Sequence, residues 1–172
     1  VRIQTWISKM KLAGYDCEWV DVEKYLTKYP VNGTHVTNKK GMETHCKNDI
    51  LNLSFMTDGI IKYNGIYYIV EIKTESVYKY QSQTEPFPDH IVQATCYSTA
   101  LGIDKVIFIY EDRNLCNKKA YLVNVTEDMK QQLVVGKIEE VENYVRDDIV
   151  PPKTDNLKHC SYCNYKDVCK IY

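Results

Sequence analysis

The sequence has no long apolar run. None reaches the roughly 20 residues that a membrane-spanning helix requires, and no segment has the order of charged and apolar residues that marks a secretory signal. The formal net charge is −1, which excludes a generally basic protein, so binding to nucleic acid would depend on a local patch. We therefore expect no membrane partner. The 172 residues suffice for one domain with a hydrophobic core.

One stretch predicts a tight hairpin with charged residues at its open end. Asn64-Gly65 lies between two runs rich in β-forming residues, which is typical of a two-residue type I′ turn. In the register of that turn, Asp58 falls directly opposite Glu71. Side chains alternate between the faces of a strand, so Lys73 lies on the same face as Glu71.

Two interpretations of these charges remain open. Like charges opposite each other repel, so the placement of Asp58 opposite Glu71 is explained if a cation lies between them. Carboxylate oxygens are ligands that Mg²⁺ prefers, and Lys73 could orient or deprotonate a water, or stabilise charge on a phosphate. The alternative is a solvated hairpin end with an ordinary Glu–Lys pair.

The rest of the chain predicts a mixed α/β architecture around a central sheet flanked by helices. Helices are expected at 2–12, 22–28, 89–101 and 126–146. Strands are expected at 17–20, 42–47, 51–57, 59–63, 66–73, 106–110 and 120–125. We expect a loop at 30–41, and a loop or broken helix at 75–88. Both faces of the hairpin carry apolar residues, so both should be covered. The predicted domains are a core at 1–150 and a cysteine-rich tail at 151–172.

The helix at 89–101 brings two polar residues to one side. Gln93 and Tyr97 are four residues apart, with His90 one turn earlier. An amide and a phenol beside a metal site could hydrogen-bond phosphate or position the lysine. They could equally be incidental polar residues on a half-exposed helix face.

The tail has the spacing of a metal site. Cys160-x2-Cys163-x5-Cys169 lies in a segment too short for its own core, and metal ligation is favoured over disulfides. A fourth ligand is needed, and Cys17, Cys46 or a residue upstream of the first could supply it. Zinc is the default metal, an iron–sulfur cluster uses the same thiolates, and reduced unliganded thiols are the remaining alternative.

The motifs together resemble a known family. Asp58…Glu71-x-Lys73 followed by Gln93-x3-Tyr97 resembles the PD-(D/E)XK nuclease superfamily, and more narrowly its RecB-like branch. The C-terminal cysteines resemble those of iron–sulfur RecB-like nucleases, such as CRISPR-associated exonucleases, the AddB nuclease domain and phage relatives. The resemblance covers roughly residues 43–172.

The resemblance implies a fold and an active site. The fold would be a restriction-endonuclease-like core. Asp58, Glu71 and the backbone carbonyl of Ile72 would bind Mg²⁺ or Mn²⁺, and Lys73 would be the catalytic lysine. The Gln93-x3-Tyr97 pair would shape the active site and contact DNA.

It also implies a [4Fe-4S] cluster on the three tail cysteines, with a fourth cysteine far upstream. The family carries a metal-binding histidine on an early helix. In this sequence His45 is a candidate for the metal-binding histidine, and Cys17 is a candidate for the fourth cluster cysteine. The uncapped helical start and the initial Val1 lead us to expect a fragment whose natural start lies upstream. In that case the cluster would be incomplete or absent.

The resulting prediction is a metal-dependent deoxyribonuclease, specifically an exonuclease in DNA repair, recombination or phage replication. It would act on DNA with a single-stranded end, in the cytoplasm of a bacterial or phage-infected cell, alongside recombination or replication proteins. Tyr78, Lys79 and Tyr80 could stack on unpaired bases or hold phosphates, unless they form an ordinary surface loop. The alternatives are a structure-selective endonuclease and a non-catalytic metal-knuckle module that binds DNA or protein.

Overall fold

The computed structural model describes residues 2–40, 43–154 and 157–169. The chain divides into two compact units, Val1–Lys137 and Ile138–Tyr172. The division falls inside helix α6 (Gly136–Arg146), whereas the sequence placed a domain boundary at residue 150.

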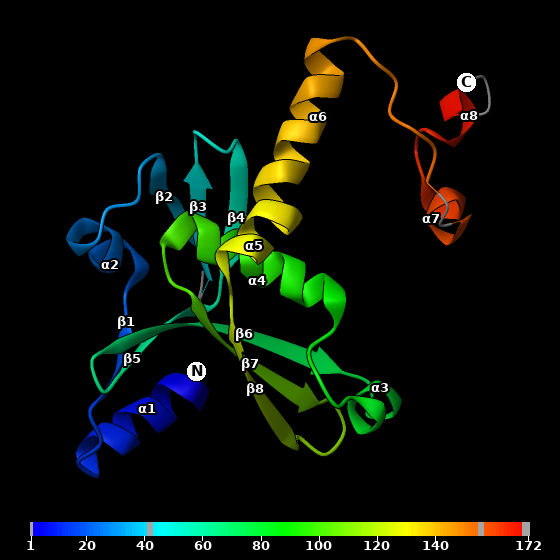
Figure 1. Cartoon of the computed structure of the whole chain (residues 1–172). Coiled ribbons are helices and arrows are strands. Elements are labelled where there is room, and N and C mark those ends of the chain that lie inside the picture. The colour runs from blue at the N-terminus through cyan, green and yellow to red at the C-terminus, as the bar shows by residue number, and fades with distance from the viewer. Residues whose placement is uncertain (1, 41–42, 155–156, 170–172) are drawn as a thin grey trace. The chain divides into compact units, whose positions relative to one another are not determined.

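The first unit alternates helices with two groups of strands (Figure 1). Its helices are α1 (Arg2–Leu12), α2 (Val22–Lys28), α3 (Val77–Ser82), α4 (Pro88–Leu101), α5 (Glu127–Lys130) and the π-helical segment η1 (Gln131–Val135). Its strands are β1 (Cys17–Val20), β2 (Thr34–Lys40), β3 (Glu43–Asn48), β4 (Leu53–Thr57), β5 (Gly59–Tyr63), β6 (Ile66–Glu75), β7 (Lys105–Asp112) and β8 (Lys118–Asn124).

The strands form a five-stranded sheet and a three-stranded sheet. The larger has the order β1-β5-β6-β7-β8 and the smaller the order β2-β3-β4. In the larger sheet β6 and β7 are parallel and the other pairs are antiparallel. Parallel neighbours need a crossover, and α3 with α4 provides it. The predicted fold class, an α/β core with a central mixed sheet flanked by helices, is confirmed.

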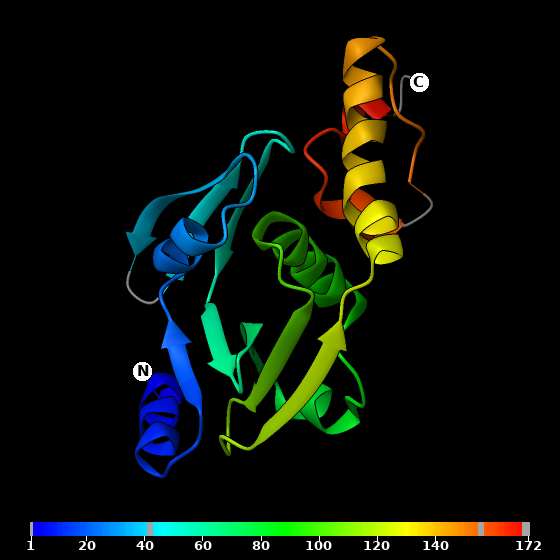
Figure 2. The same ribbon diagram turned by 60° about the vertical axis from the view of Figure 1, so that its left-hand side comes forward.

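Helices cover both faces of the larger sheet, as the hairpin pattern predicts. Ile60 and Ile69 belong to the main hydrophobic core, together with Leu101 of α4. Ile61 and Val70, one position along each strand, pack in a second cluster under α1. Figures 1 and 2 show α1 and α4 on opposite sides of this sheet. The apolar residues that alternate along β5 and β6 therefore contribute side chains to two hydrophobic cores, one on each face of the sheet.

The β5–β6 turn has the predicted geometry. Asn64 and Gly65 have φ angles of 47° and 80°, and both are positive as a type I′ turn requires. Tyr63 pairs with Ile66, and the register continues outward without a shift to Gly59 opposite Val70. This register sets the positions of the charged residues beyond it.

The loop predicted at 30–41 is wrong, because β2 occupies most of it. β2 pairs with β3 across an irregularity between Val36 and Asn38. The hydroxyl of Thr34 also donates to the carbonyl of Ala100, at 2.7 Å. Tertiary pairing has overridden the polar composition of this segment. The other expected strands and helices are present, except that η1 interrupts the helix predicted at 126–146.

The described part of the second unit consists of helices joined by irregular segments. It holds most of α6, followed by α7 (Leu157–Tyr162) and α8 (Lys166–Cys169). Pro151 and Pro152 separate α6 from α7, as expected from their inability to continue a helix. Among the described helices, none has the length and apolar character needed to cross a membrane.

Candidate active site

Asp58 is the single residue between the two sheets. Thr57 before it pairs with Thr44 in the smaller sheet, and Gly59 after it pairs with Val70 in the larger. The backbone is therefore fixed on both sides of the carboxylate. The backbone N–H of Ile72 donates to Oδ2 of Asp58 at 2.7 Å, which holds this carboxylate against β6.

Glu71 lies on β6, the middle strand of the larger sheet, with 4% of its surface exposed. Lys73 donates to one of its oxygens, Oε1, at 2.6 Å. The other oxygen, Oε2, is buried and has no hydrogen-bond partner in the described part of the chain. A buried carboxylate oxygen without a partner is costly, so this atom is a position that a ligand would stabilise.

Burial controls the ionisation of both acids. It raises the pKa of Glu71 to about 7, and the hydrogen bond from Lys73 opposes this without cancelling it. It also raises the pKa of Asp58, against the hydrogen bond from the Ile72 N–H. Glu43 adds negative charge that raises the pKa of both. A cation would favour the charged form of each.

Lys73 is held by a chain of polar contacts that starts on α4. Its ammonium donates to Oε1 of Gln93 at 2.7 Å. The amide of Gln93 in turn donates to the hydroxyl of Tyr97, one turn along the helix. The ring of Tyr97 is 3% exposed and stacks on Phe55 of β4 with centroids 5.2 Å apart. The predicted Gln-x3-Tyr pair is thus brought to the lysine, and a buried aromatic stack fixes its far end.

These residues line one cleft with a volume of about 440 Å³. Its polar lining includes Asp58, Glu71, Lys73, Gln93 and Tyr97. The sequence analysis missed a further acid in this cleft, Glu43. A signal for it was present, since antiparallel pairing places the start of one strand beside the end of the next.

A divalent cation fits this donor set. Two carboxylates with raised pKa values and an unpartnered oxygen, Oε2 of Glu71, lie on one cleft. Within the described residues, no group of three or more His, Cys, Asp or Glu side chains is gathered closely enough to hold a metal. The protein side chains that could hold the cation are Asp58 and Glu71, with water completing the shell, and the sequence resemblance would add the backbone carbonyl of Ile72.

The two candidate ligands lie elsewhere. His45 is on β3 opposite Met56, outside the lining of the cleft, and its Nε2 is buried without a partner in the described structure. Cys17 is buried in the cluster under α1, and its thiol donates to the carbonyl of Ile7 at 3.4 Å. The structure thus does not bring His45 into the cleft of the carboxylate pair, and the proposed role of Cys17 as a ligand of the tail cluster stays a prediction from the sequence.

The three tail cysteines lie within a short helical segment. Cys160 is on α7, Cys169 is on α8, and Cys163 is in the turn between them. The N–H of Tyr165 donates to the sulfur of Cys163 at 3.3 Å. In the described segment the three thiols are not gathered into a metal-binding group. The iron–sulfur cluster and its zinc alternative stay predictions from the sequence.

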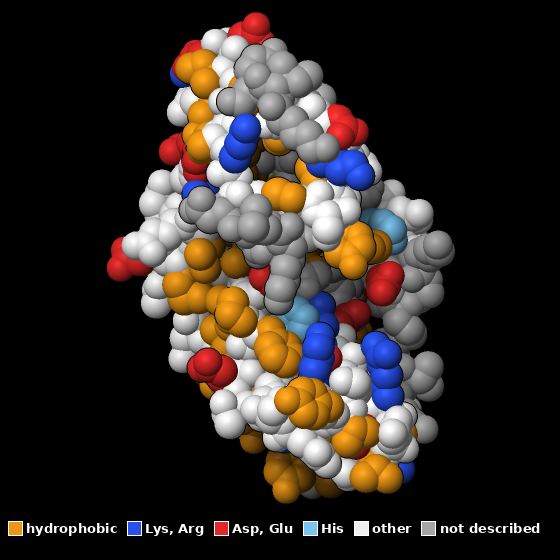
Figure 3. Space-filling view, turned by 90° about the vertical axis from the view of Figure 1, so that its right-hand side faces the viewer, with side chains coloured by type: hydrophobic (Ala, Val, Ile, Leu, Met, Phe, Trp, Pro, Cys, Tyr) orange, Lys and Arg blue, Asp and Glu red, His pale blue; other side chains and the backbone are white. Residues whose placement is uncertain are grey.

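The Tyr78-Lys79-Tyr80 prediction needs a correction. These residues are on the short helix α3, and Tyr78 is 83% exposed, but Tyr80 is only 8% exposed. Lys119 lies 4.5 Å from the centroid of the Tyr80 ring, so this ring is not free to stack on a base. Lys79 lies 5.9 Å from the ring centroid of Phe87. Figure 3, which views the side that carries α3, shows Lys or Arg side chains beside hydrophobic ones.

No protein-family model matches the chain, and no curated protein matches its sequence. Among solved structures, it is similar to the crystal structure of SSO0001, with a TM-score of 0.46 and 16% identity over 98% of this chain and 67% of that one. It is also similar to an alkaline exonuclease, LHK-Exo from Laribacter hongkongensis, with a TM-score of 0.44 and 16% identity. That match covers 73% of this chain and 66% of the exonuclease. At this level neither similarity transfers an activity.

Proposed function

We propose that this protein is a nuclease that uses a divalent cation to hydrolyse phosphodiester bonds in DNA. The observation that carries the proposal is the position of the Lys73 ammonium. It lies 2.6 Å from a carboxylate oxygen of Glu71 and 2.7 Å from the amide oxygen of Gln93, on a cleft that also holds Asp58. An ammonium group beside a buried acid, Glu71, and a half-buried acid, Asp58, suits the chemistry of a phosphate group.

Each residue has a distinct role in the proposal. Asp58 and Glu71 would hold Mg²⁺ or Mn²⁺, which when bound lowers the pKa of water and neutralises charge on the phosphate. As an ammonium, Lys73 would orient the attacking water and stabilise charge that develops on the phosphate; as a neutral amine, it would instead take the proton of the water. Gln93 and Tyr97 would keep the ammonium in place and contact DNA.

The finer form of the proposal is an exonuclease acting on DNA with a single-stranded end. It is supported by the order of the motifs, which matches the RecB-like branch in the sequence. The residue Tyr78, exposed on α3, remains a proposed contact for an unpaired base.

Cleavage of labelled DNA with Mg²⁺, Mn²⁺ or EDTA tests the activity. We expect cleavage only with a divalent cation, and a loss of about a hundredfold or more in Asp58→Asn. The matched control is Asp49→Asn, because Asp49 is an exposed acid paired with Lys47 on the smaller sheet. Equal rates in the two variants would reject the proposed role of the site.

Comparing linear DNA with covalently closed circles tests the finer form. An exonuclease releases short products from linear DNA and leaves closed circles intact. Cleavage of circles would support the endonuclease, and binding without cation-dependent cleavage would support the non-catalytic module. For the tail, visible absorption and metal analysis of anaerobically purified protein test the proposed cluster on Cys160, Cys163 and Cys169.

A further inference from the structure

Three hollows of the first unit have lining residues in common. The cleft described above shares Glu43 and Asp58 with a smaller hollow of about 150 Å³. The smaller hollow in turn shares Trp19, Val20 and Asp21 with a third, of about 300 Å³. The three hollows therefore form a series with overlapping linings, from the cleft to the third hollow beside β1.

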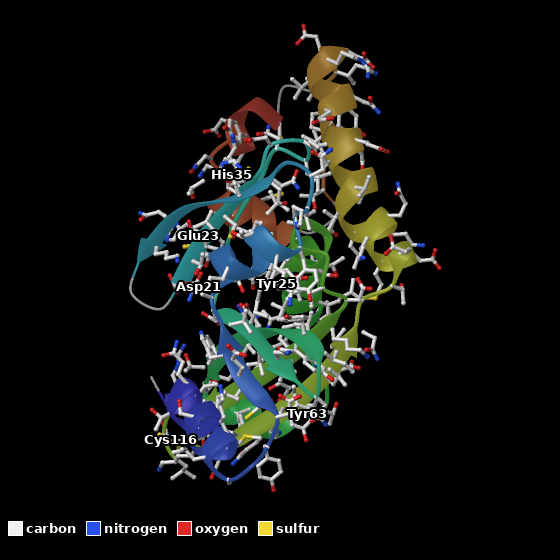
Figure 4. All side chains as sticks on the ribbon, turned by 90° about the vertical axis from the view of Figure 1, so that its left-hand side faces the viewer. Asp21, Glu23, Tyr25, His35, Tyr63 and Cys116 are labelled. Carbon is white, nitrogen blue, oxygen red and sulfur yellow. The ribbon has the colours of Figure 1, made fainter. Side chains whose placement is uncertain are left out.

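The third hollow carries a cluster of tyrosines, which we name the tyrosine trio: Tyr25, Tyr29 and Tyr67. Their ring centroids lie 5.1–5.4 Å apart. Tyr25, labelled on α2 in Figure 4, is buried and supports the other two, while Tyr29 is 41% exposed. Tyr29 is thus an exposed ring held in place by packing, which suits stacking of a planar group with little loss of side-chain freedom.

Lysines surround the trio. Lys24, Lys28 and Lys62 line the hollow, and the Lys28 ammonium lies 5.2 Å from the centroid of the Tyr29 ring. Hydrogen bonds from Tyr67 and then from Lys28 lower the pKa of Tyr29, and the charges of Lys28 and Lys62 add to this. The exposed ring therefore lies in a positive environment.

Two acids near the hollow, Asp21 and Asp104, are held in ion pairs with lysines. Glu18 lies opposite Lys62 in the register of β1 and β5. Asp21 is held by Lys39 at 2.9 Å, and Asp104, which acts on Tyr25 from outside the hollow, is paired with Lys130.

Two lysines of the hollow are left for a ligand. In the described part of the chain, no ion pair engages Lys24 or Lys28. Two such ammonium groups beside an exposed ring match a nucleotide, which presents a planar base and an anionic phosphate.

We propose that this hollow is a second binding site for single-stranded DNA, in which a base stacks on Tyr29 and the adjoining phosphates contact Lys24 and Lys28. The site rests on the proposed function, because the strand would continue from the scissile phosphate past the smaller hollow to Tyr29. Lys28 would exchange its contact with the ring for one with a phosphate.

Fluorescence anisotropy with labelled oligodeoxythymidylate in EDTA tests the site without requiring cleavage. We expect Tyr29→Ala to weaken binding by about five- to tenfold, and Tyr29→Phe to retain it, since stacking needs the ring and not the hydroxyl. The matched control is Tyr63→Ala, because Tyr63 is a similarly exposed tyrosine at the hairpin turn, away from Tyr25 in Figure 4. Binding by Tyr29→Ala within about twofold of the control would overturn the site.

The lysines are tested by the salt dependence of binding. Replacing Lys24 and Lys28 by Gln removes two phosphate contacts, so the slope of log K against log salt should fall by roughly 1.4, at about 0.7 per contact for single strands. Replacing Lys9 and Lys11, two exposed lysines of α1, is the matched control and should leave the slope unchanged. A slope that falls equally in both double variants would contradict the site.

Two further experiments distinguish a failure of the second binding site from a failure of the proposed cleavage activity. Binding of duplex DNA should be unaffected by Tyr29→Ala, and an equal loss for duplex and single strand would overturn the single-strand assignment. Cross-linking of oligonucleotides that carry 5-iododeoxyuridine should modify Tyr29, and its absence from the cross-linked peptides would count against stacking. Both readouts are independent of whether the cleft cleaves DNA.

Discussion

Asp58 and Glu71 lie one position beyond the last paired residues of the β5–β6 hairpin, Gly59 and Val70, and both line one cleft. The Ile72 N–H, the next donor along β6, binds the Asp58 carboxylate. Two acids held this way repel in the absence of a cation. The first predictions concern how the protein behaves with and without one.

The stability of the cation-free protein should depend on the ionisation of Glu71. Its pKa is about 7 in the folded protein against 4.5 as the ordinary value. Between these values the folded state binds more protons than the unfolded state. Stability from this group is therefore full below pH 4.5 and is lost as the pH rises through 7.

Glu71→Gln should remove this pH dependence. The difference between wild type and variant should reach at most about 3 kcal/mol, at about 1.4 kcal/mol per pKa unit. Denaturant unfolding in EDTA from about pH 4 to 8 measures this difference in stability, because that range covers the folded and the unfolded pKa of Glu71. Parallel curves for the two proteins would contradict the assigned pKa.

Cation binding should require Asp58 as well as Glu71. Asp58→Asn removes one of two charged ligands, so the affinity for Mn²⁺ should fall by roughly tenfold or more. Isothermal titration measures it, with Asp49→Asn as the control that removes an exposed acid. Mn²⁺ should also stabilise the wild type more at pH 8 than at pH 5, because it competes with protons for the same oxygens.

Tyr97 should affect the cleavage rate by keeping the Lys73 ammonium in position, and not by binding the cation. Tyr97→Phe keeps the ring stacked on Phe55 but leaves the Gln93 amide without its acceptor. We expect the cleavage rate to fall by roughly tenfold, because the Lys73 ammonium is held less well. Mn²⁺ affinity should be unchanged, and a parallel loss of affinity would instead indicate a damaged fold.

Gly59 should be intolerant of a side chain. A Cβ there would lie 2.0 Å from the Trp19 ring, and the φ angle is +156°. Gly59→Ala should destabilise the protein by about 2 kcal/mol and displace Asp58, so Mn²⁺ affinity should fall as well. Gly65→Ala is the matched control, since a Cβ at Gly65 meets nothing within 4 Å. Its strain at positive φ should cost about 1 kcal/mol and leave Mn²⁺ affinity intact.

Local sequence rules predicted much of the core of the site. The Asn64-Gly65 turn fixes the hairpin register, and the register alone places Asp58 opposite Glu71. Period-2 alternation in the same strands anticipated that both faces would be covered. These features depend on neighbouring residues, which is why they could be read from one segment.

Features that depend on strand pairing outside the Asn-Gly hairpin, or on tertiary packing, were missed. β2 was taken for a loop because its Asn and Lys residues are poor strand formers, and only pairing with β3 and the bond from Thr34 to α4 make it a strand. Glu43 was missed as a member of the cleft because its place there depends on the pairing of β3 with β4, which the sequence analysis did not use. Burial of Tyr80 depends on packing with β7 and β8, which the polar pattern around it does not show.

The most direct test of the account compares Lys73→Ala with Lys105→Ala in cleavage of labelled DNA at saturating Mn²⁺. Lys105 is a lysine at the start of β7 that contacts Asn124, so its variant controls for loss of a positive charge. The account predicts that Lys73→Ala loses about a hundredfold or more in rate while it still binds Mn²⁺, and that Lys105→Ala cleaves like the wild type. Cleavage by Lys73→Ala at the wild-type rate would contradict it.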